Sequence, residues 1–381
     1  MLSIDGHCDL LSALLESGMD LYLGQEAQIT KSRWHLGGPD LLVTAIYVAE
    51  KYLPHQKEAK ALQMAGIFWQ LATQNEFTPI LEAKDLDKPG KKALLAIEGG
   101  EPISSPEDLH AFYRLGVRML SFAWNHQNHL ATGCLEEYQG GLTKRGLDIL
   151  ATASKLSIIL DVSHLSEGSF WSVLEKANNP VIASHSNAYV LHPHPRNLKD
   201  EQLKALAEKG GVIAVNFCTE FLAQPTINSV VEQISYLAEL IGVEHVGIGS
   251  DYLGISKPPS GLEHIGKWLT LEEVLEEKGF NKDECANILG GNLERLFRKT
   301  ISNSSKRTCY ERRFLDGAIE INYSSESIKL FKLEDIDHDD LDYHLVDIAE
   351  VGIGKCLKQW NKGIANLSSD NRVCYLVQTP M

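Results

Sequence analysis

Apolar and β-branched residues recur along the first 300 positions in short runs, each followed by a longer stretch in which the apolar positions have helical spacing. Continuous apolar runs of this length are typical of strands buried on both faces, as in parallel sheets. We expect eight strands, at residues 2–4, 42–47, 93–97, 118–122, 157–160, 181–183, 212–215 and 246–248. Because strands and helices alternate, the pattern predicts repeated βα units.

The segments between these strands predict helices. Residues 57–74 and 228–240 each carry an apolar stripe, and Ser105-Pro106-Glu107-Asp108 is typical of a capped helix start with proline in the first turn. Eight βα units that close on themselves form a barrel of roughly 250 to 300 residues. The sequence therefore predicts an α/β fold with a (β/α)8 TIM barrel over residues 1–300.

A different kind of sequence follows the barrel. Ser302-Asn303-Ser304-Ser305 predicts a linker, and strand-like runs come at residues 318–323, 328–333 and 373–377 with a helix-like stretch at 345–360. This order predicts a small C-terminal α+β appendage over residues 301–381. A module of about 80 residues is at the margin of independent stability, and no motif in it indicates a role.

Composition narrows the class of protein. The chain has 36 Lys+Arg against 51 Asp+Glu, a net charge of −15, and no cluster of cations that would bind phosphates. Seven cysteines, an odd number without close pairs, favour a reducing compartment over a disulfide framework. The N-terminus lacks the basic and apolar regions of a signal peptide, and no stretch reaches the ~20 apolar residues of a membrane span. We expect a cytoplasmic protein that binds neither nucleic acid nor membrane.

The candidate chemistry lies where the expected strands end. In a parallel barrel these ends share one rim, so side chains from different strands face one another there. Five of the eight strand ends carry an imidazole or a carboxylate: His7 and Asp9, Glu98, Asp161 with His164, His185, and Asp251. One such residue alone is usually a hydrogen-bonded loop residue, but five together predict a metal site. Histidine with carboxylate suits zinc or manganese.

The motifs on these strand ends are characteristic of one family. They are Asp5-Gly6-His7-Cys8-Asp9, Ala96-Ile97-Glu98-Gly99, Leu160-Asp161-Val162-Ser163-His164, Ser184-His185-Ser186-Asn187-Ala188, Pro195-Arg196-Asn197 and Gly247-Ile248-Gly249-Ser250-Asp251. Over about residues 2–300 the sequence resembles peptidase family M19, the membrane (renal) dipeptidase family, and in particular its bacterial-type members. The resemblance implies a barrel of the metal-dependent amidohydrolase type and a zinc dipeptidase.

The resemblance also implies a role for each matching residue. His7 and Asp9 would hold one Zn²⁺, His164 and His185 a second, and Glu98 would bridge both, with Asp251 as the catalytic acid/base and Arg196 as the group that binds the substrate carboxylate. Manganese or another divalent metal is the alternative to zinc. Two such ions can share a water and lower its pKa, which gives a bridging hydroxide whose proton Asp251 can take.

Two positions depart from the family pattern. Trp124 falls where mammalian-type members have a histidine that contacts substrate, so we do not transfer that role and treat the adjacent Asn125 as a candidate substrate or oxyanion contact. Leu253 stands where relatives often have an acidic residue, which alters the expected pocket but not the metal ligands.

The leading hypothesis is a dipeptidase for small dipeptides with a free C-terminal carboxylate, including those with a C-terminal D-residue, and a homodimer is the candidate assembly. Another amidohydrolase reaction, on a lactam, a lactone or an N-acyl amino acid, is the first alternative. The second is a catalytically silent barrel whose C-terminal tail mediates an interaction.

Overall fold

The structure is a computed structural model that describes residues 1–178 and 180–301, and the backbone of five short strands between residues 312 and 378. Eight parallel strands pair in chain order: β1 (Ile4–Cys8), β2 (Leu41–Tyr47), β4 (Lys92–Glu98), β5 (Val117–Ser121), β6 (Ile159–Asp161), β7 (Val181–Ala183), β8 (Val212–Val215) and β9 (Val246–Ile248). A parallel bridge between Cys8 and Tyr252 brings β1 beside the segment that follows β9. The predicted α/β barrel is therefore confirmed as a nearly closed ring of eight strands.

All eight predicted strands are present, and β7, β8 and β9 have the predicted bounds. The largest error is in β1, which continues to Cys8 because its backbone pairs with β2 as far as Thr44. His7 therefore lies inside the strand and not after it. Sequence periodicity also missed β3 (Thr78–Pro79), which is only two residues long and pairs with β4.

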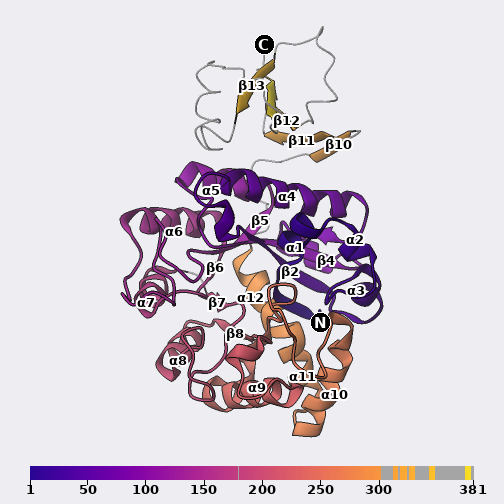
Figure 1. The fold of residues 1–381 in the computed structure, drawn as a ribbon, viewed down its shortest axis with the longest axis vertical. Helices are drawn as coiled ribbons and strands as arrows, with labels where there is room; N and C mark the ends of the chain where they lie inside the picture. Colours follow the sequence, from indigo (N-terminus) through magenta and orange to yellow (C-terminus); the bar gives the residue numbers. More distant parts are fainter. Residues whose placement is uncertain are drawn as a thin grey trace.

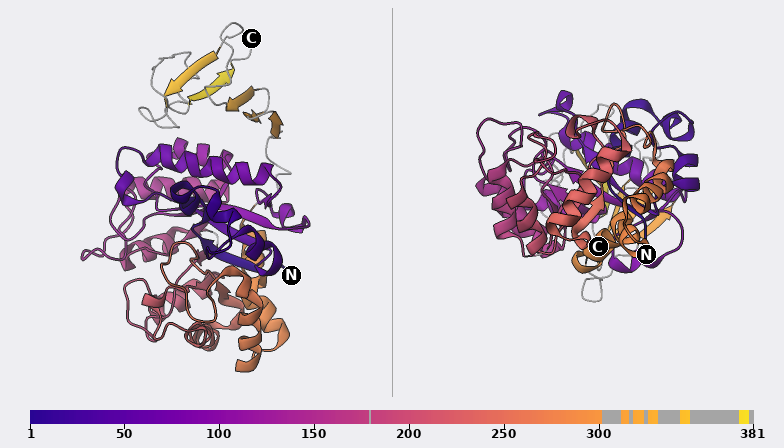
Figure 2. Two further views of the ribbon diagram at one scale, coloured as in Figure 1. Left: turned by 45° about the vertical axis from the view of Figure 1, so that its right-hand side comes forward. Right: turned by 90° about the horizontal axis from the view of Figure 1, so that it is seen from below.

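Helices cover the outside of the strands (Figures 1 and 2). They are α1 (Leu10–Ser17), α2 (Asp20–Leu23), α3 (Lys31–Gly37), α4 (Lys57–Thr73), α5 (Pro106–Arg114), α6 (Lys144–Leu156), α7 (Glu167–Lys176), α8 (Asp200–Glu208), α9 (Ile227–Ile241), α10 (Trp268–Lys278), α11 (Lys282–Ala286) and α12 (Asn292–Thr300). Short 3₁₀ segments are η1 (Glu50–Tyr52), η2 (Ala83–Asp87), η3 (Thr219–Phe221), η4 (Val243–His245) and η5 (Ile265–Lys267), and η6 (Asn287–Gly291) is a π-helix. The predicted start of α5 is confirmed, since the Ser105 side chain accepts a hydrogen bond from the backbone N–H of Asp108.

The hydrophobic core has two parts because strand side chains alternate between the two faces of the sheet. Along β2, Leu41 and Val43 pack in the cluster inside the barrel, whereas Leu42 and Ile46 pack in the cluster between strands and helices. Three residues of α12, Leu293, Leu296 and Phe297, belong to the inner cluster. The interior of the barrel is thus filled by apolar side chains, including those of α12. The polar groups lie at the rim at the other end of the barrel.

The described strands of the C-terminal segment are β10 (Arg312–Leu315), β11 (Ala318–Tyr323), β12 (Glu326–Leu330), β13 (Tyr343–Asp347) and β14 (Cys374–Gln378). They form an antiparallel sheet in the order β10-β11-β12-β14-β13. The helix predicted at residues 345–360 is wrong at its start, because residues 345–347 pair with β14, and pairing with a neighbouring strand overrides helical spacing. The rest of that predicted helix lies outside the described residues.

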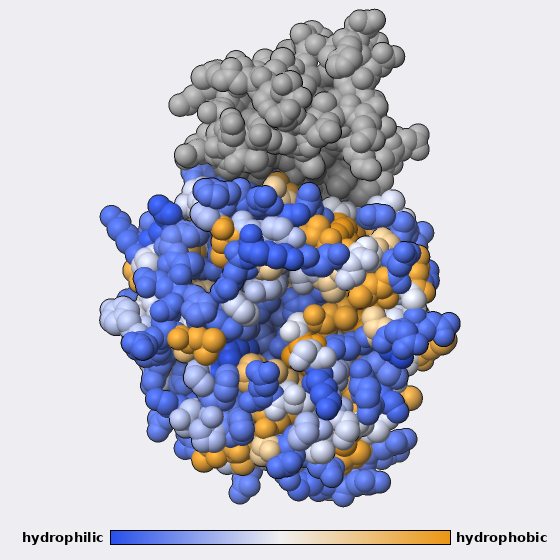
Figure 3. Space-filling view, in the orientation of Figure 1, coloured by the Kyte–Doolittle hydropathy of each residue, from blue (hydrophilic) through white to orange (hydrophobic). Residues whose placement is uncertain are grey.

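Within the described residues, no helix combines the length and apolarity that a membrane span requires. Figure 3 shows that one face of the barrel is mainly hydrophilic, with small hydrophobic patches and a hollow near its centre. The four cysteines of the described barrel, Cys8, Cys134, Cys218 and Cys285, are unpaired. Cys8 is fully buried in the cluster between strands and helices.

Candidate active site

A first candidate metal group forms where β1 and β4 end. His7 is the fourth residue of β1, Asp9 follows that strand, and Glu98 is the last residue of β4. The Nε2 atom of His7 lies 3.6 Å from Oδ2 of Asp9 and 3.5 Å from Oε2 of Glu98. All three residues are buried, and each offers one donor atom within 4.8 Å of the other two.

A second candidate group forms on the other oxygen of Glu98. His164 Nε2 lies 2.8 Å from Glu98 Oε1, and His185 Nε2 lies 3.4 Å from the same oxygen. The two imidazole Nε2 atoms are 2.8 Å apart. His164 and His185 come from the loops after β6 and β7, so four barrel strands deliver the two groups. Glu98 therefore has the placement of a carboxylate shared between two sites.

The residues present fit two divalent cations. The Nε2 atom of His7 is buried and has no hydrogen-bond partner among the described residues, although burial of an unpaired polar atom is costly. The facing Nε2 atoms of His164 and His185 likewise require a proton or a cation between them and Glu98. Buried imidazole and carboxylate donors at this spacing are the ligands that zinc and manganese use in proteins.

The environment keeps His164 and His185 neutral, which is the protonation state that binds metal. Burial, together with the nearby charge of Arg196, lowers the pKa of His164 to about 3. Burial and the charge of His7 hold the pKa of His185 well below its usual value. Both rings therefore offer a lone pair at neutral pH.

The pKa values of His7 and Glu98 are shifted in opposite directions, and each shift favours the charged form of the group. Burial opposes protonation of His7, but the nearby carboxylates of Glu98 and Asp9 outweigh it and raise the His7 pKa well above its usual value. For Glu98, burial favours the neutral form, but the charge of His7 and the adjacent imidazoles of His164 and His185 lower the pKa well below the usual range. The carboxylates that attract a proton to His7 would equally attract a cation.

Asp251 lies beside both groups, three residues after β9. One of its oxygens is also within 4.8 Å of donor atoms of His7 and His185. Burial raises the pKa of Asp251 to about 7, and the charges of Asp9 and Glu98 act in the same direction. A carboxyl group with this pKa can take up and release a proton near neutral pH, which suits a general acid/base.

The backbone of the rim is strained at site residues. His164, Asp251 and Leu253 have φ angles of 68°, 62° and 71°, in the left-handed region that non-glycine residues rarely adopt. Such conformations cost of order 1 to 3 kcal/mol each and cluster at functional sites. Two of these three residues, His164 and Asp251, carry side chains predicted to act in the site. The strained backbone therefore coincides with residues whose side chains face the site.

Arg196 is buried in the wall of the same site, with only 3% of its surface exposed. Its Nη2 donates a 3.0 Å hydrogen bond to the carbonyl oxygen of His185, and its guanidinium lies 5.4 Å from the centre of the Phe221 ring. Its Nε has no hydrogen-bond partner among the described residues. A buried guanidinium with a free donor, next to the metal groups, can bind a carboxylate.

Trp124 and Asn125 lie in the segment that follows β5. Trp124 packs between Tyr47 and His164, with ring centres 5.1 and 5.8 Å away. The Oδ1 atom of Asn125 lies 2.8 Å from Nδ1 of His164, so the amide oxygen is engaged by a candidate ligand. His126, adjacent in sequence, points outward and contacts Glu136.

Three residues that sequence reasoning did not assign support the site. Asn216 directly follows β8, and its Nδ2 donates to Oδ2 of Asp251 at 3.0 Å. Tyr47 ends β2 and lines the cavity. Ser184 bonds the ring of His185. The strand-end criterion would have found Tyr47 and Asn216 if it had been extended to uncharged side chains.

Asp161 behaves differently from the other rim carboxylates. It ends β6, but its Oδ1 accepts hydrogen bonds from the backbone N–H groups of Ser163 and Ser184, each at 3.0 Å. It belongs to none of the metal groups found among the described residues. The structure thus separates Asp161, which binds backbone, from the carboxylates that face the cavity.

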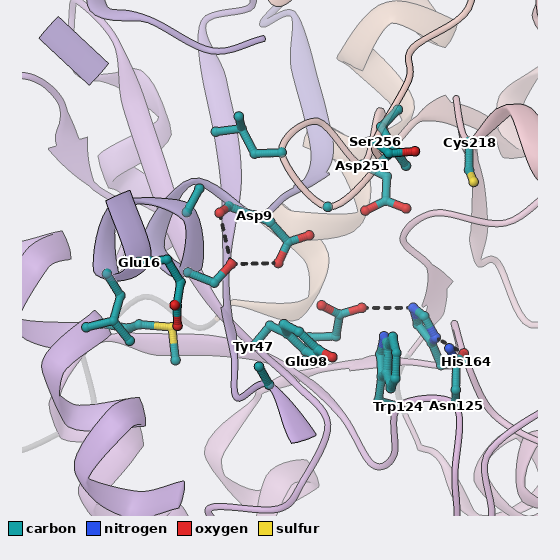
Figure 4. A pocket seen from close by; sticks show the side chains of 18 of the residues that line it. Asp9, Glu16, Tyr47, Glu98, Trp124, Asn125, His164, Cys218, Asp251 and Ser256 are labelled. Carbon is teal, nitrogen blue, oxygen red and sulfur yellow. Dashed lines mark hydrogen bonds and ion pairs between the residues drawn. The ribbon is translucent and has the colours of Figure 1, made fainter. Parts of the chain in front are cut away.

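These groups open into a cavity of about 490 Å³. Its lining includes Asp9, Glu98, Trp124, His164, Arg196 and Asp251. In Figure 4 the side chains of Asp9, Glu98, His164 and Asp251 converge on the middle of the cavity, with Glu16 and Cys218 on opposite sides. A second cavity, of about 440 Å³, shares His164 and Arg196 with the first.

Comparison with known proteins agrees with this arrangement. The model of the family described as membrane dipeptidase (peptidase family M19) matches residues 1–310. Dipeptidase aclJ of Aspergillus oryzae is 35% identical over an alignment of 217 residues, which covers 55% of this chain and 51% of that protein. The chain spans about half the length of this and the other fungal dipeptidases that it matches.

Two solved structures share the fold. A metallopeptidase from Rhodobacter sphaeroides, liganded with a phosphinate mimic of the dipeptide L-Ala-D-Ala, is 26% identical with a TM-score of 0.71, covering 78% of this chain and 99% of that one. Dipeptidase AC, a metallopeptidase of family M19, is 27% identical with a TM-score of 0.72, covering 79% and 99%. Since the family model spans most of the chain and the fold agrees, this chain belongs to the membrane dipeptidase family, peptidase family M19.

Proposed function

We propose that this protein is a metal-dependent dipeptidase that hydrolyses small dipeptides with a free C-terminal carboxylate. The observation that carries the proposal is Glu98, whose two oxygens face separate histidine groups in a cavity that also holds Asp251 and Arg196. The names of the relatives support it, as does the dipeptide mimic bound to the structural neighbour from Rhodobacter sphaeroides.

Two zinc ions are the cofactors that the donor set favours, with manganese or another divalent cation as the alternative. His7 and Asp9 would hold one ion, His164 and His185 the other, and Glu98 both. When bound, such ions supply Lewis acidity toward the scissile carbonyl and lower the pKa of a water molecule held there. The neutral state of His164 and His185 prepares them for this role.

Asp251 would move the proton. Its carboxyl lies at the edge of both groups and can take the proton of the attacking water and pass it to the amine that leaves. Asn216 holds one oxygen of Asp251 through a 3.0 Å hydrogen bond, which leaves the other oxygen for this transfer. A general acid/base near neutral pKa is matched to hydrolysis near neutral pH.

Arg196 would fix the substrate. Its unpartnered Nε and the charge of the guanidinium provide a site for the C-terminal carboxylate on the wall of the cavity. A cavity of about 490 Å³ falls within the usual size of small-molecule sites, about 300 to 1,000 Å³. Dipeptides with a C-terminal D-residue belong to the proposed substrates, since the ligand of the structural neighbour mimics L-Ala-D-Ala.

A substrate panel tests the proposal. The metal-loaded full-length protein is incubated with L,L and L,D dipeptides, their C-terminal amides, N-acyl amino acids, a lactam and a lactone. We expect two free amino acids from the dipeptides and little turnover of the other compounds. Preferential hydrolysis of N-acyl amino acids, the lactam or the lactone would replace the dipeptidase assignment by the corresponding amidohydrolase reaction, and no turnover at all would favour a silent barrel.

We also propose that residues 301–381 form a module separate from the barrel. In support, α12 ends at Thr300, and the described strands β10 to β14 pair only with one another. Comparing the full chain with a chain that ends at residue 301, for metal content and turnover, tests this division. Loss of metal from the shortened chain would contradict it.

A further inference from the structure

The hydroxyl of Ser184 lies between a carboxylate and the imidazole of a candidate metal ligand. Its Oγ is 2.5 Å from Oδ2 of Asp161 and 2.8 Å from Nδ1 of His185. Ser184 and His185 are fully buried and Asp161 is 3% exposed. Water therefore does not compete for these hydrogen bonds, and each group depends on the others for its partners.

The direction of the two hydrogen bonds follows from what each group can donate. The carboxylate of Asp161 accepts from the backbone N–H of Ser163 and of Ser184 on Oδ1, and from the Ser184 hydroxyl on Oδ2. Because a carboxylate has no proton to give, the hydroxyl proton of Ser184 lies in its bond to Asp161. The Ser184 oxygen then presents a lone pair to His185, whose Nδ1 must be the donor.

This hydrogen bond fixes the tautomer of His185. A neutral imidazole with a proton on Nδ1 has its lone pair on Nε2. Nε2 is the atom that faces Oε1 of Glu98 at 3.4 Å and Nε2 of His164 at 2.8 Å. The lone pair of His185 is therefore aimed at the second metal group before any ion binds.

The other histidine of this group has a weaker partner. Nδ1 of His164 lies 2.8 Å from the amide oxygen of Asn125, which is a neutral acceptor. His185 alone of the two is connected to a buried carboxylate, through Ser184. Hydrogen bonds in a buried chain polarise one another, so the bond between Ser184 and His185 is strengthened by the bond from Ser184 to Asp161, and the two histidines are held unequally.

We propose that Asp161 and Ser184 are positioning residues for the metal site, acting as a carboxylate–hydroxyl–imidazole relay that fixes the ring and tautomer of His185 and raises the basicity of its Nε2. The proposal rests on the proposed function, because it requires a metal ion held by Glu98, His164 and His185. Partners of this kind behind a ligand typically change metal affinity by about 10- to 100-fold when removed.

The chain contains a matched control for the relay. Asp5 of β1 accepts from the backbone N–H of Ser250 at 2.8 Å and from its hydroxyl at 2.5 Å, the same geometry that joins Asp161 to Ser184. Ser250 is also fully buried, but among the described residues no imidazole bonds its hydroxyl, which accepts instead from the backbone N–H of Tyr252. Ser250→Ala thus removes an equivalent hydroxyl–carboxylate bond without removing a hydrogen bond to an imidazole of the metal groups.

The experiment measures zinc affinity of the full-length protein by competition with a chromophoric chelator, for wild type, Ser184→Ala, Ser184→Thr and Ser250→Ala. We expect Ser184→Ala to weaken one of the two zinc sites by about 10- to 100-fold, whereas Ser184→Thr, which keeps the hydroxyl, stays within about threefold of wild type. Ser250→Ala should also stay within about threefold. Wild-type affinity in Ser184→Ala, or an equal loss in Ser250→Ala, would overturn the relay.

A second measurement needs no variant and covers the case in which Ser184→Ala fails to fold. The ¹⁵N chemical shifts of the His185 ring in the metal-free wild type should show a protonated Nδ1 and a bare Nε2. The opposite tautomer would reject the relay.

The zinc titration of wild type separates this inference from the function on which it rests. Two bound ions in wild type with unchanged affinity in Ser184→Ala reject the relay alone. A wild type that binds no zinc or manganese rejects both the metal centre and the relay.

Discussion

The side-chain amide of Asn216 donates a hydrogen bond of 3.0 Å to Oδ2 of Asp251. Asn216 is itself held, since its backbone N–H bonds the side chain of Asn187 at 2.9 Å. Asp251 has a φ angle of 62°, and this hydrogen bond holds one oxygen of its carboxylate in place. The side-chain nitrogen of Asn216 can only donate a hydrogen bond. Oδ2 of Asp251 is therefore held in place, and the other carboxylate oxygen is left free.

Asn216→Ala should therefore lower turnover while the metal content stays normal. Loss of one hydrogen bond to a charged group corresponds to about 1.5 to 3 kcal/mol, or roughly a 10- to 150-fold lower kcat. Asn292→Ala is the control: Asn292 is also fully buried, and its amide bonds the carbonyls of Val243 and Val246 far from the site. It should reduce Tm without changing kcat. Equal kcat losses in both variants would mean that Asn216 acts only through stability.

Glu98→Gln should weaken both metal sites together. Each oxygen of Glu98 faces a different histidine group, and an amide cannot offer two anionic oxygens. Elemental analysis after dialysis should find less than one equivalent of zinc per chain, against two for wild type. Full occupancy in this variant would show that Glu98 does not bridge.

Asp251→Asn should separate chemistry from metal binding. We expect near-normal zinc content and a kcat reduced about 100-fold or more, the usual scale for loss of a general acid/base. The measurement also tests the other role that the geometry permits, because Asp251 lies with His7 and His185 in a third donor group. If zinc is lost with activity, Asp251 is a ligand.

Arg196→Ala should change the preference between a dipeptide and its C-terminal amide. Wild type should strongly prefer the free acid, because a buried charge-assisted pair is worth about 1.5 to 3 kcal/mol. In the variant that preference should collapse through loss of kcat/KM on the acid and not through gain on the amide. Equal rates on acid and amide in wild type would remove the carboxylate role of Arg196 and weaken the dipeptidase proposal.

Gly249→Ala should destabilise the barrel beside the site. A Cβ at Gly249 would lie 1.7 Å from the carbonyl oxygen of Ser184, so the backbone that carries His185 would have to move. Overpacking of this kind costs about 1 to 3 kcal/mol, visible as a lower Tm.

Gly66→Ala is the control, because Gly66 lies in α4 and its Cβ would meet nothing within 4 Å. There we expect a gain of about 0.5 to 1 kcal/mol. A Tm for Gly249→Ala at or above that of wild type would contradict the close approach.

The order of strands and the candidate ligands could be read from the sequence because both depend on local patterns. Runs such as residues 181–183 and 212–215 are apolar throughout, since parallel barrel strands are buried on both faces. Once eight such strands are expected, barrel topology places every strand end on one rim. His7, Glu98 and His185 could thus be predicted to share a site although they are far apart in the chain.

The spacing of apolar residues could not predict how far each strand pairs with its neighbours. β1 is longer than its apolar run because β2 and Tyr252 provide partners for the polar residues after Ile4. In the C-terminal segment, pairing with β14 makes residues 345–347 a strand where local spacing predicts helix. Both errors have one cause, since strand formation depends on a neighbour that is distant in sequence.

The sequence by itself determined which residue types stand at the strand ends, because that follows from the order of residues along each βα unit. Only the tertiary structure decided what each side chain does there. Asp161 and Glu98 both end strands, yet Asp161 bonds Ser184 and Glu98 faces the two histidine groups. Asn125 contacts His164, and Asn216 contacts Asp251. The reason is physical: a hydrogen bond requires its partners within about 3 Å, and the closure of the barrel, not the local sequence, brings these partners together.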